Sequence, residues 1–216
     1  MISPSSPPTP LVVGETSRSA DIAETPPAVS PSAGELRQTV FSKDRVYRFT
    51  LWRSWGQPKE LPYGRMGKDG FEPVPIKGAA EFVMFIGLNP STADESKNDP
   101  TIRRCIAFAK RWGYGAMCMT NLFAYRATLP KDMMAFSEPI GMDNGPHLIS
   151  VARYASVVVA CWGKHGRHND RDANVICLFE MSGLASKISC LSVNTDGTPK
   201  HPLYLRADTK LEGFPQ

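Results

Sequence analysis

Residues 82–94, Phe-Val-Met-Phe-Ile-Gly-Leu-Asn-Pro-Ser-Thr-Ala-Asp, constrain the fold of this chain more than any other stretch. The apolar first half predicts a buried strand, and the polar second half predicts a loop where that strand ends. Asp99 and Pro100 then predict a helix, because Asp is a favourable N-cap and Pro suits the first helical position. A strand that leads through a polar loop into a helix is typical of α/β proteins, which bind ligands beside the carboxyl ends of their strands.

The same pattern repeats along the chain. Further apolar runs predict strands at 116–123, 157–162 and 188–193, and helical spacing predicts helices at 100–112, 143–154 and 171–182. The alternation predicts an α/β fold, a three-layer αβα sandwich with a mostly parallel central sheet. One further strand is expected within residues 39–53, where residues 46–52 alternate between two faces.

Composition changes sharply at residue 35. Residues 1–34 hold seven of the nineteen prolines and no aromatic residue, so we expect a disordered tail. Residues 35–216 are expected to form a single α/β domain, with the sequence motifs at about 80–205. Residues 56–79, rich in Gly and Pro, predict a long loop whose Arg65, Lys68 and Lys77 either face a polyanion or are simply solvated.

Charge and cysteine usage narrow the range of partners. The net charge is +4, and the tail contributes one arginine against three acidic residues, so the body is modestly basic and compatible with a nucleic-acid partner. No run is apolar enough to span a membrane and no signal pattern opens the chain, so we expect a cytoplasmic protein; its oligomeric state stays open, with a monomer favoured. The five cysteines lack C-x-x-C spacing, which predicts buried free thiols and neither a metal site nor a cofactor.

Four polar stretches follow the four predicted parallel strands, at residues 89–94, 120–121, 162–171 and 200–206. Because the carboxyl ends of parallel strands share one edge of a sheet, we expect these stretches to converge. Each stretch alone is weak, since Asn-Pro after a strand is usually a turn and a single histidine is usually structural. Their ordered combination is more specific.

This combination resembles the uracil-DNA glycosylase superfamily. Residues 86–90, Ile-Gly-Leu-Asn-Pro, are similar to the Gly-x-Asn-Pro motif of its mismatch-type thymine/uracil branch. Residues 159–163, Val-Ala-Cys-Trp-Gly, are similar to the strand before its second motif, and residues 201–205, His-Pro-Leu-Tyr-Leu, resemble His-Pro-Ser-Pro-Leu. A still closer resemblance, over about residues 80–205, is to a bacterial family catalogued as domain of unknown function 1643.

The glycosylase resemblance implies residue roles. Asn89 would position the attacking water, Asn121 would read the pyrimidine edge, His201 would stabilise the leaving base and Leu205 would wedge into the duplex. Asn89 stands where the uracil-specific branch has Asp, and Asn cannot act as a base, so Asp94 or Asp99 would activate the water unless Asp99 serves only as a cap. Leu203 and Tyr204 replace Ser and Pro of the second motif, which removes its phosphate contact.

Aromatic and basic residues near these motifs complete the candidate site. Tyr125 or Phe123 would stack on a flipped base, although either could instead belong to the core. The candidate phosphate contacts, which could equally be solvated charges, are Arg103, Arg104, Arg126, Lys164, Arg167, Arg171 and Lys200.

Together these residues predict a glycosylase-like hydrolase that cleaves the N-glycosidic bond of a pyrimidine base, modified or not, flipped out of DNA. Two alternatives stay open: a nucleic-acid or nucleotide binding module without catalysis, and an N-glycosidase for a nucleoside or nucleotide.

Overall fold

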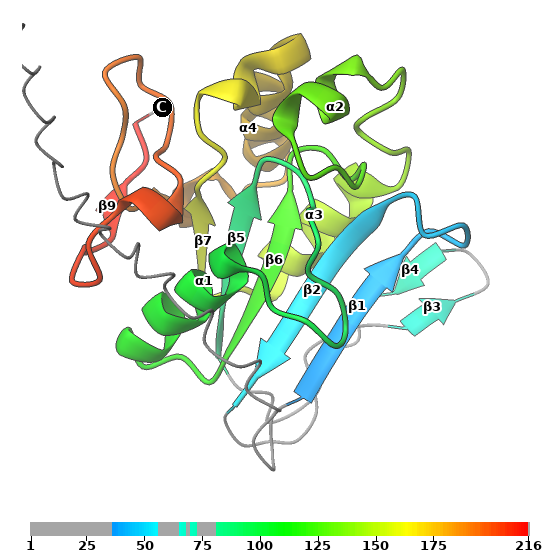
Figure 1. Cartoon of the computed structure of the whole chain (residues 1–216). Helices are drawn as coiled ribbons and strands as arrows, with labels where there is room; N and C mark the ends of the chain where they lie inside the picture. Colours follow the sequence, from blue (N-terminus) through cyan, green and yellow to red (C-terminus); the bar gives the residue numbers. More distant parts are fainter. Residues whose placement is uncertain (1–35, 56–64, 68–69, 73–80, 216) are drawn as a thin grey trace, which may run out of the picture.

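The computed structural model describes residues 36–55, 65–67, 70–72 and 81–215 (Figure 1). The expected tail, and Lys68 and Lys77 of the expected loop, lie outside this part of the chain. In chain order the elements are β1 Leu36–Phe41, β2 Arg48–Ser54, β3 Arg65–Gly67, β4 Gly70–Glu72, β5 Phe82–Gly87, α1 Pro100–Arg111, β6 Ala116–Asn121, α2 Pro130–Ala135, α3 Asn144–Tyr154, β7 Val157–Ala160, α4 Arg171–Met181, β8 Ile188–Cys190 and β9 Glu212–Gly213. Short 3₁₀ helices span Lys164–Asp170, Ala185–Lys187 and Pro202–Tyr204.

A seven-stranded mixed sheet forms the centre of the fold, in the order β1-β2-β6-β5-β7-β8-β9. The four central strands β6, β5, β7 and β8 are parallel, which confirms the predicted α/β class with a mostly parallel middle. The outer pairings β1–β2, β2–β6 and β8–β9 are antiparallel. β3 and β4 pair with each other in a separate small sheet.

Helices lie on both faces of this sheet because its central strands are apolar on both faces. On one face, Ile102 and Phe108 of α1 pack in one cluster with Val83 and Phe85 of β5. On the other face, α3 and α4 pack in a second cluster that contains Met84 of β5. Every residue of β5 and β6 is buried, as expected of parallel strands covered from both sides.

The predicted start of α1 is confirmed. Asp99 is extended and its Oδ1 accepts a hydrogen bond from the Ile102 amide at 2.8 Å, while Pro100 occupies the first turn. Such a cap contributes about 1 kcal/mol to helix stability. The helix ends at Arg111, and Gly113 takes the left-handed backbone conformation, with φ of 85°.

The single strand expected within residues 39–53 is instead a hairpin of β1 and β2. The register shifts between Val40, which pairs with Thr50, and Phe41, which pairs with Arg48, so Phe49 is an extra residue in β2. Phe49 stacks on His147 of α3, with ring centroids 4.5 Å apart. A bulge of this kind reverses the alternation of side chains that follow it, so the regular alternation predicted for residues 46–52 does not hold.

β3 and β4 lie within residues 56–79, where only a loop was predicted, and β9 was not predicted. β6, β7 and β8 stop two or three residues before the predicted boundaries, and α2 was not predicted. Four cysteines are buried free thiols as expected, whereas Cys177 is exposed. Within the described residues, no helix has both the length and the apolar character needed to cross a membrane.

Candidate functional site

The main cavity of the described structure lies where the connections of the parallel sheet change direction. From β5 the chain passes through α1, on one face, to β6; it then passes through α3, on the other face, to β7 on the far side of β5. The loops after β5 and β7 therefore diverge, and a crevice opens between them. A cavity of about 890 Å³ lies here, and the loops after all four parallel strands contribute to its lining.

Three of the residues predicted to bind or act on the substrate meet in this cavity. Asn89 follows β5, Asn121 ends β6, and His201 lies in the segment after β8. Lys164, after β7, and Lys200 also line the cavity, and so do Arg48, Asp99, Trp162 and Tyr204. The structure thus brings together Asn89, Asn121 and His201, three of the residues to which the glycosylase resemblance assigns a role.

Asn89 is held in one orientation by two main-chain oxygens. Its Nδ2 donates to the carbonyl of Ala127 at 2.7 Å and to that of Pro90 at 3.1 Å. Because a carbonyl can only accept, the amide nitrogen must face these oxygens, and Oδ1 is left as an acceptor on the other side. An acceptor fixed in this way is suited to orienting a water molecule.

Asn121 offers a buried hydrogen-bonding group without a partner. Its side chain is only 3% exposed, and its Nδ2 has no hydrogen-bond partner among the described residues. Leaving such a group unpaired costs about 1–3 kcal/mol, which a ligand atom in the cavity would recover. Gly87 allows this placement, because a Cβ there would lie 2.9 Å from Asn121 Oδ1.

His201 caps the 3₁₀ turn Pro202–Tyr204, where its Nδ1 accepts a long hydrogen bond, 3.4 Å, from the Leu203 amide. Burial lowers the pKa of His201, and the negative charge of Asp99 only partly opposes this shift. A neutral imidazole that accepts at Nδ1 carries its proton on Nε2. His201 is therefore a neutral donor at the wall of the cavity.

The two acidic candidates are placed differently. Asp94 does not line the cavity: its Oδ1 accepts from the amides of Ser96 and Lys97 and from the Ser96 hydroxyl, each at 2.8 Å. Burial alone would raise the pKa of Asp94, but these hydrogen bonds outweigh it and lower the pKa. Asp99 lines the cavity while its Oδ1 caps α1.

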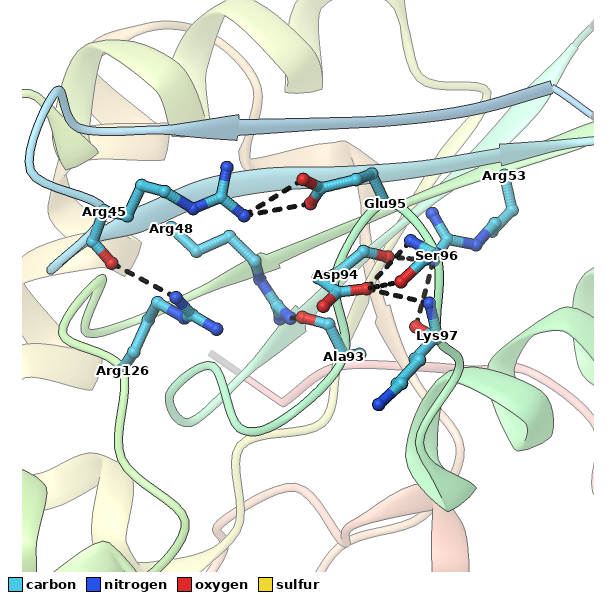
Figure 2. Close-up of polar contacts among 9 residues, drawn as sticks. All are labelled: Arg45, Arg48, Arg53, Ala93, Asp94, Glu95, Ser96, Lys97 and Arg126. Carbon is cyan, nitrogen blue, oxygen red and sulfur yellow. Dashed lines mark hydrogen bonds and ion pairs between the residues drawn. The ribbon is translucent and has the colours of Figure 1, made fainter. Parts of the chain in front are cut away.

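Two buried arginines of β2, which the sequence did not suggest, support the loop that carries Asn89 (Figure 2). Nη1 of Arg48 donates to the Ala93 carbonyl at 2.8 Å. Arg53 donates from Nε to Asn98 Oδ1 at 2.7 Å, and from Nη2 to the carbonyls of Asp94 and Lys97. In a regular strand residues five apart face opposite sides, and the bulge at Phe49 brings both arginines to the same side.

The hairpin makes further contacts with this loop. Arg37 of β1 donates to the Ser96 carbonyl at 2.7 Å, and Arg45, in the turn between the strands, pairs with Glu95 at 3.0 Å. Burial lowers the pKa of Arg48 to about 10, so its side chain remains charged at neutral pH. Two arginines that flank the apolar residues Phe49, Leu51 and Trp52 are the signal that could have revealed this role, since buried charges require partners.

The two aromatic candidates lie away from the main cavity. Phe123 is completely buried in the core beside His168. Tyr125 stacks on Phe136, with ring centroids 3.8 Å apart, and lines a second, smaller cavity. Two other aromatic residues line the main cavity: Trp162, which is buried, and Tyr204, which is 85% exposed and whose ring centroid lies 5.7 Å from that of His201.

Several of the basic candidates donate hydrogen bonds to main-chain carbonyl oxygens. Arg103 donates to Asn98, Arg104 to Leu205 and Arg167 to Asp196. Arg171 is buried, and its Nε donates to Leu122 at 2.9 Å.

The guanidinium of Arg171 therefore lies in the interior and not on a phosphate-binding surface, and this burial lowers its pKa. Leu205, the expected wedge, is half-buried against the cluster that contains α1. Arg126 is half-buried beside the second cavity. Lys164 and Lys200 are therefore the predicted cationic contacts that line the main cavity.

In the described part of the chain, no group of three or more His, Cys, Asp or Glu side chains is arranged to hold a metal ion. The polar groups at the cavity are amides, hydroxyls, two imidazoles, two carboxylates and cationic side chains, a set suited to hydrogen bonding with an organic ligand.

Comparison with known proteins gives one match. Neither the curated proteins nor the solved structures yield a match to this chain. Residues 48–203, well over half of the chain, match the family described as "Protein of unknown function (DUF1643)". The matched region begins at Arg48 and so includes β2 with both of its loop-supporting arginines, as well as Asn89, Asn121 and His201. The chain belongs to the DUF1643 family.

Proposed function

We propose that this protein is a glycosylase-like hydrolase, which cleaves the N-glycosidic bond between a pyrimidine base and its sugar. The observation that carries the proposal is the shared cavity of about 890 Å³, which Asn89, Asn121 and His201 all line. Breaking this bond places positive charge on the sugar and negative charge on the leaving base. A fixed donor at the base and a positioned water at the sugar would stabilise both.

Each residue has a role that matches its chemistry. Nε2–H of His201 donates to the oxygen of the leaving base, and the unpaired Nδ2 of Asn121 donates to the edge of the base. Oδ1 of Asn89 orients the water. The water adds to the sugar carbon, its proton passes to Asp99, and the electron pair of the broken bond leaves with the base. Asp99 takes this role in place of Asp94, whose carboxylate is occupied by its own loop.

The exposed residues of the last motif fit a flipped-out base. Extruding a base from a stack leaves a gap or an unstacked neighbour. Tyr204 and Leu203 are the exposed apolar side chains of this segment, so we assign them the wedge role in place of Leu205.

A second candidate, an N-glycosidase for a free nucleotide, is favoured by one observation. Five of the seven basic candidates donate to main-chain oxygens, Arg126 and Arg171 among them, which leaves few cations for a long DNA backbone.

Release of free base tests the proposal directly. The protein would be incubated with single-stranded and duplex oligonucleotides that carry uracil, thymine or 5-substituted pyrimidines, and with the matching nucleosides and monophosphates. Free base would be measured by mass spectrometry. We expect release from at least one substrate, and a loss of about 100-fold in His201→Gln with binding retained.

The matched control is His168→Gln, which lies beside Phe123 outside the main cavity and should release base at the wild-type rate. Absence of base release from every substrate would overturn the catalytic proposal and leave a base-binding module. Equal single-turnover rates for wild type and His201→Gln would overturn the role given to His201.

A further inference from the structure

A second cavity, of about 400 Å³, adjoins the main one. Ser91, Ala127 and Thr128 line both cavities. The shared wall includes Ala127, whose carbonyl accepts the hydrogen bond that orients Asn89. A molecule that extends from the main cavity past this wall would reach the second cavity next to the residue that we expect to position water.

The second cavity carries more positive than negative charge. Arg45 and Arg126 both line it, and their guanidinium carbons lie 3.9 and 4.9 Å from the centroid of the same Phe41 ring. Arg45 pairs with Glu95 at 3.0 Å. Arg126 donates from Nη1 to the Arg45 carbonyl at 3.2 Å, and no carboxylate of the described residues contacts it.

Of the two arginines in this cavity, Arg126 is the stronger candidate for contact with an anion, because of the cation near it and the burial of its Nε. The charge of Arg126 contributes, after the larger effect of burial, to the lowered pKa of Arg48, so a third cation lies close by. Nε of Arg126 is buried and has no hydrogen-bond partner in the described structure. An anion in this cavity would relieve the repulsion between these cations and give Arg126 a charged partner.

Hydroxyl groups complete the surroundings. Ser91, Thr92 and Thr128 line the second cavity, and their hydroxyls make no hydrogen bond to any described residue. A guanidinium beside several free hydroxyls matches a tetrahedral phosphate, whose oxygens accept from both kinds of donor.

We propose that the second cavity binds a phosphate group of the substrate whose base occupies the main cavity. This inference rests on the proposed function and deepens it: the substrate is a phosphate-bearing nucleotide and not a free nucleoside. The phosphate belongs either to a free nucleotide or to a phosphodiester of a nucleic-acid strand, and the two sources share the chemistry that Arg126 recognises.

Inorganic phosphate is the first probe, because its binding does not depend on catalysis. Titration of the full chain should show saturable binding by calorimetry. Arg126→Gln, which keeps most of the side-chain volume and removes the charge, should weaken binding at least about tenfold. Arg153→Gln, an exposed arginine of α3 outside both cavities, is the matched control and should bind as wild type does. Thr128→Val, at an exposed position, should weaken binding less and covers the case in which Arg126→Gln fails to fold.

Three ligands with the same base then identify the source of the phosphate. A 5′-monophosphate that binds at least about tenfold more tightly than the nucleoside, with the difference abolished in Arg126→Gln, would identify a free nucleotide. The same dependence seen only with a short single-stranded oligonucleotide would identify a phosphodiester. Equal affinity of wild type and Arg126→Gln for every phosphate-bearing probe would overturn the inference. Phosphate-dependent binding without base release would retain this inference while the proposed hydrolase activity fails.

Discussion

Arg53 carries a positive charge into the interior, where such a side chain is stable only with hydrogen-bonding partners. Its guanidinium contacts Asn98 Oδ1 and the carbonyls of Trp52, Asp94 and Lys97. Arg53→Met should therefore lower the free energy of unfolding by about 3 kcal/mol, because these acceptors would lose their donor in a buried place. Urea denaturation followed by circular dichroism measures this change.

Arg103→Met is the control for this prediction. Arg103 is exposed and donates to a single carbonyl, that of Asn98, so its loss should cost less than about 1 kcal/mol. Similar losses in the two variants would contradict the anchoring role given to Arg53.

His147 makes the stability of the fold depend on pH. Burial lowers its pKa to about 4, against the opposing charge of Asp143, whereas an unfolded histidine titrates near 6.5. As pH falls from about 6.5 towards 4, the unfolded chain gains a proton that the folded chain does not, so the free energy of unfolding decreases by up to about 3 kcal/mol. Below that range this group causes no further loss.

Urea unfolding between pH 7.5 and 4.5 tests this sign. His147→Phe keeps a ring against Phe49 and should flatten the loss of stability below pH 6.5. His201 also has a lowered pKa and contributes with the same sign, so His201→Gln should remove a further part of the slope. If the free energy of unfolding of His147→Phe fell with pH as steeply as that of the wild type, other groups would be responsible for the loss of stability in acid.

The start of α1 combines a structural and a chemical role in one carboxylate. Asp99 caps the helix through Oδ1 and also lines the main cavity. Asp99→Asn should keep the cap, because Asn is as favourable there, but abolish base release, because an amide cannot take a proton. Asp99→Ala should in addition lower stability by about 1 kcal/mol. Thermal unfolding beside base release separates the roles, and an active Asp99→Asn would exclude Asp99 as the base.

At the level of the elements, local patterns predicted what depends on local sequence. The apolar run of β5 and the cap of α1 are readable from neighbouring residues, and both are confirmed. The turn between β1 and β2 was missed because Ser42 to Val46 contains no Gly or Pro, yet Arg45 adopts φ of 59° there. α2 has only six residues, too few to show a helical period.

At the level of the whole molecule, the sequence predicted only those site residues that come at or after the carboxyl ends of the parallel strands. Asn89, Asn121 and His201 follow parallel strands, and these strands end at the same edge. Arg48 lies at the beginning of its strand, and reaches that edge only because β2 runs antiparallel to β6. Neither this pairing nor the bulge that turns Arg48 towards the loop leaves a periodic signal in the sequence.

The small number of candidate phosphate contacts beside the two cavities predicts a weak dependence of nucleic-acid binding on salt. Lys164, Lys200 and Arg126 are the candidate phosphate contacts beside the cavities, so about three counterions would be released from a single strand. We expect log Kobs to fall with log salt with a slope of about −2, measured by fluorescence anisotropy. Lys164→Gln should make the slope shallower by about 0.7, whereas Arg171→Met should not change it, because Arg171 is buried. A slope of −5 or steeper would indicate a much larger basic surface.

The contacts between the hairpin and the loop that carries Asn89 have a consequence for how the family can diversify. Arg37, Arg48 and Arg53 bind this loop mostly through main-chain carbonyls, which every amino acid possesses. Ser96 and Lys97, which these arginines contact only through their carbonyls, can therefore exchange side chains over evolutionary time while the loop keeps its position. With such an arrangement the conformation of a loop can be conserved while its side chains change. Related proteins could then acquire new ligand preferences on the same scaffold.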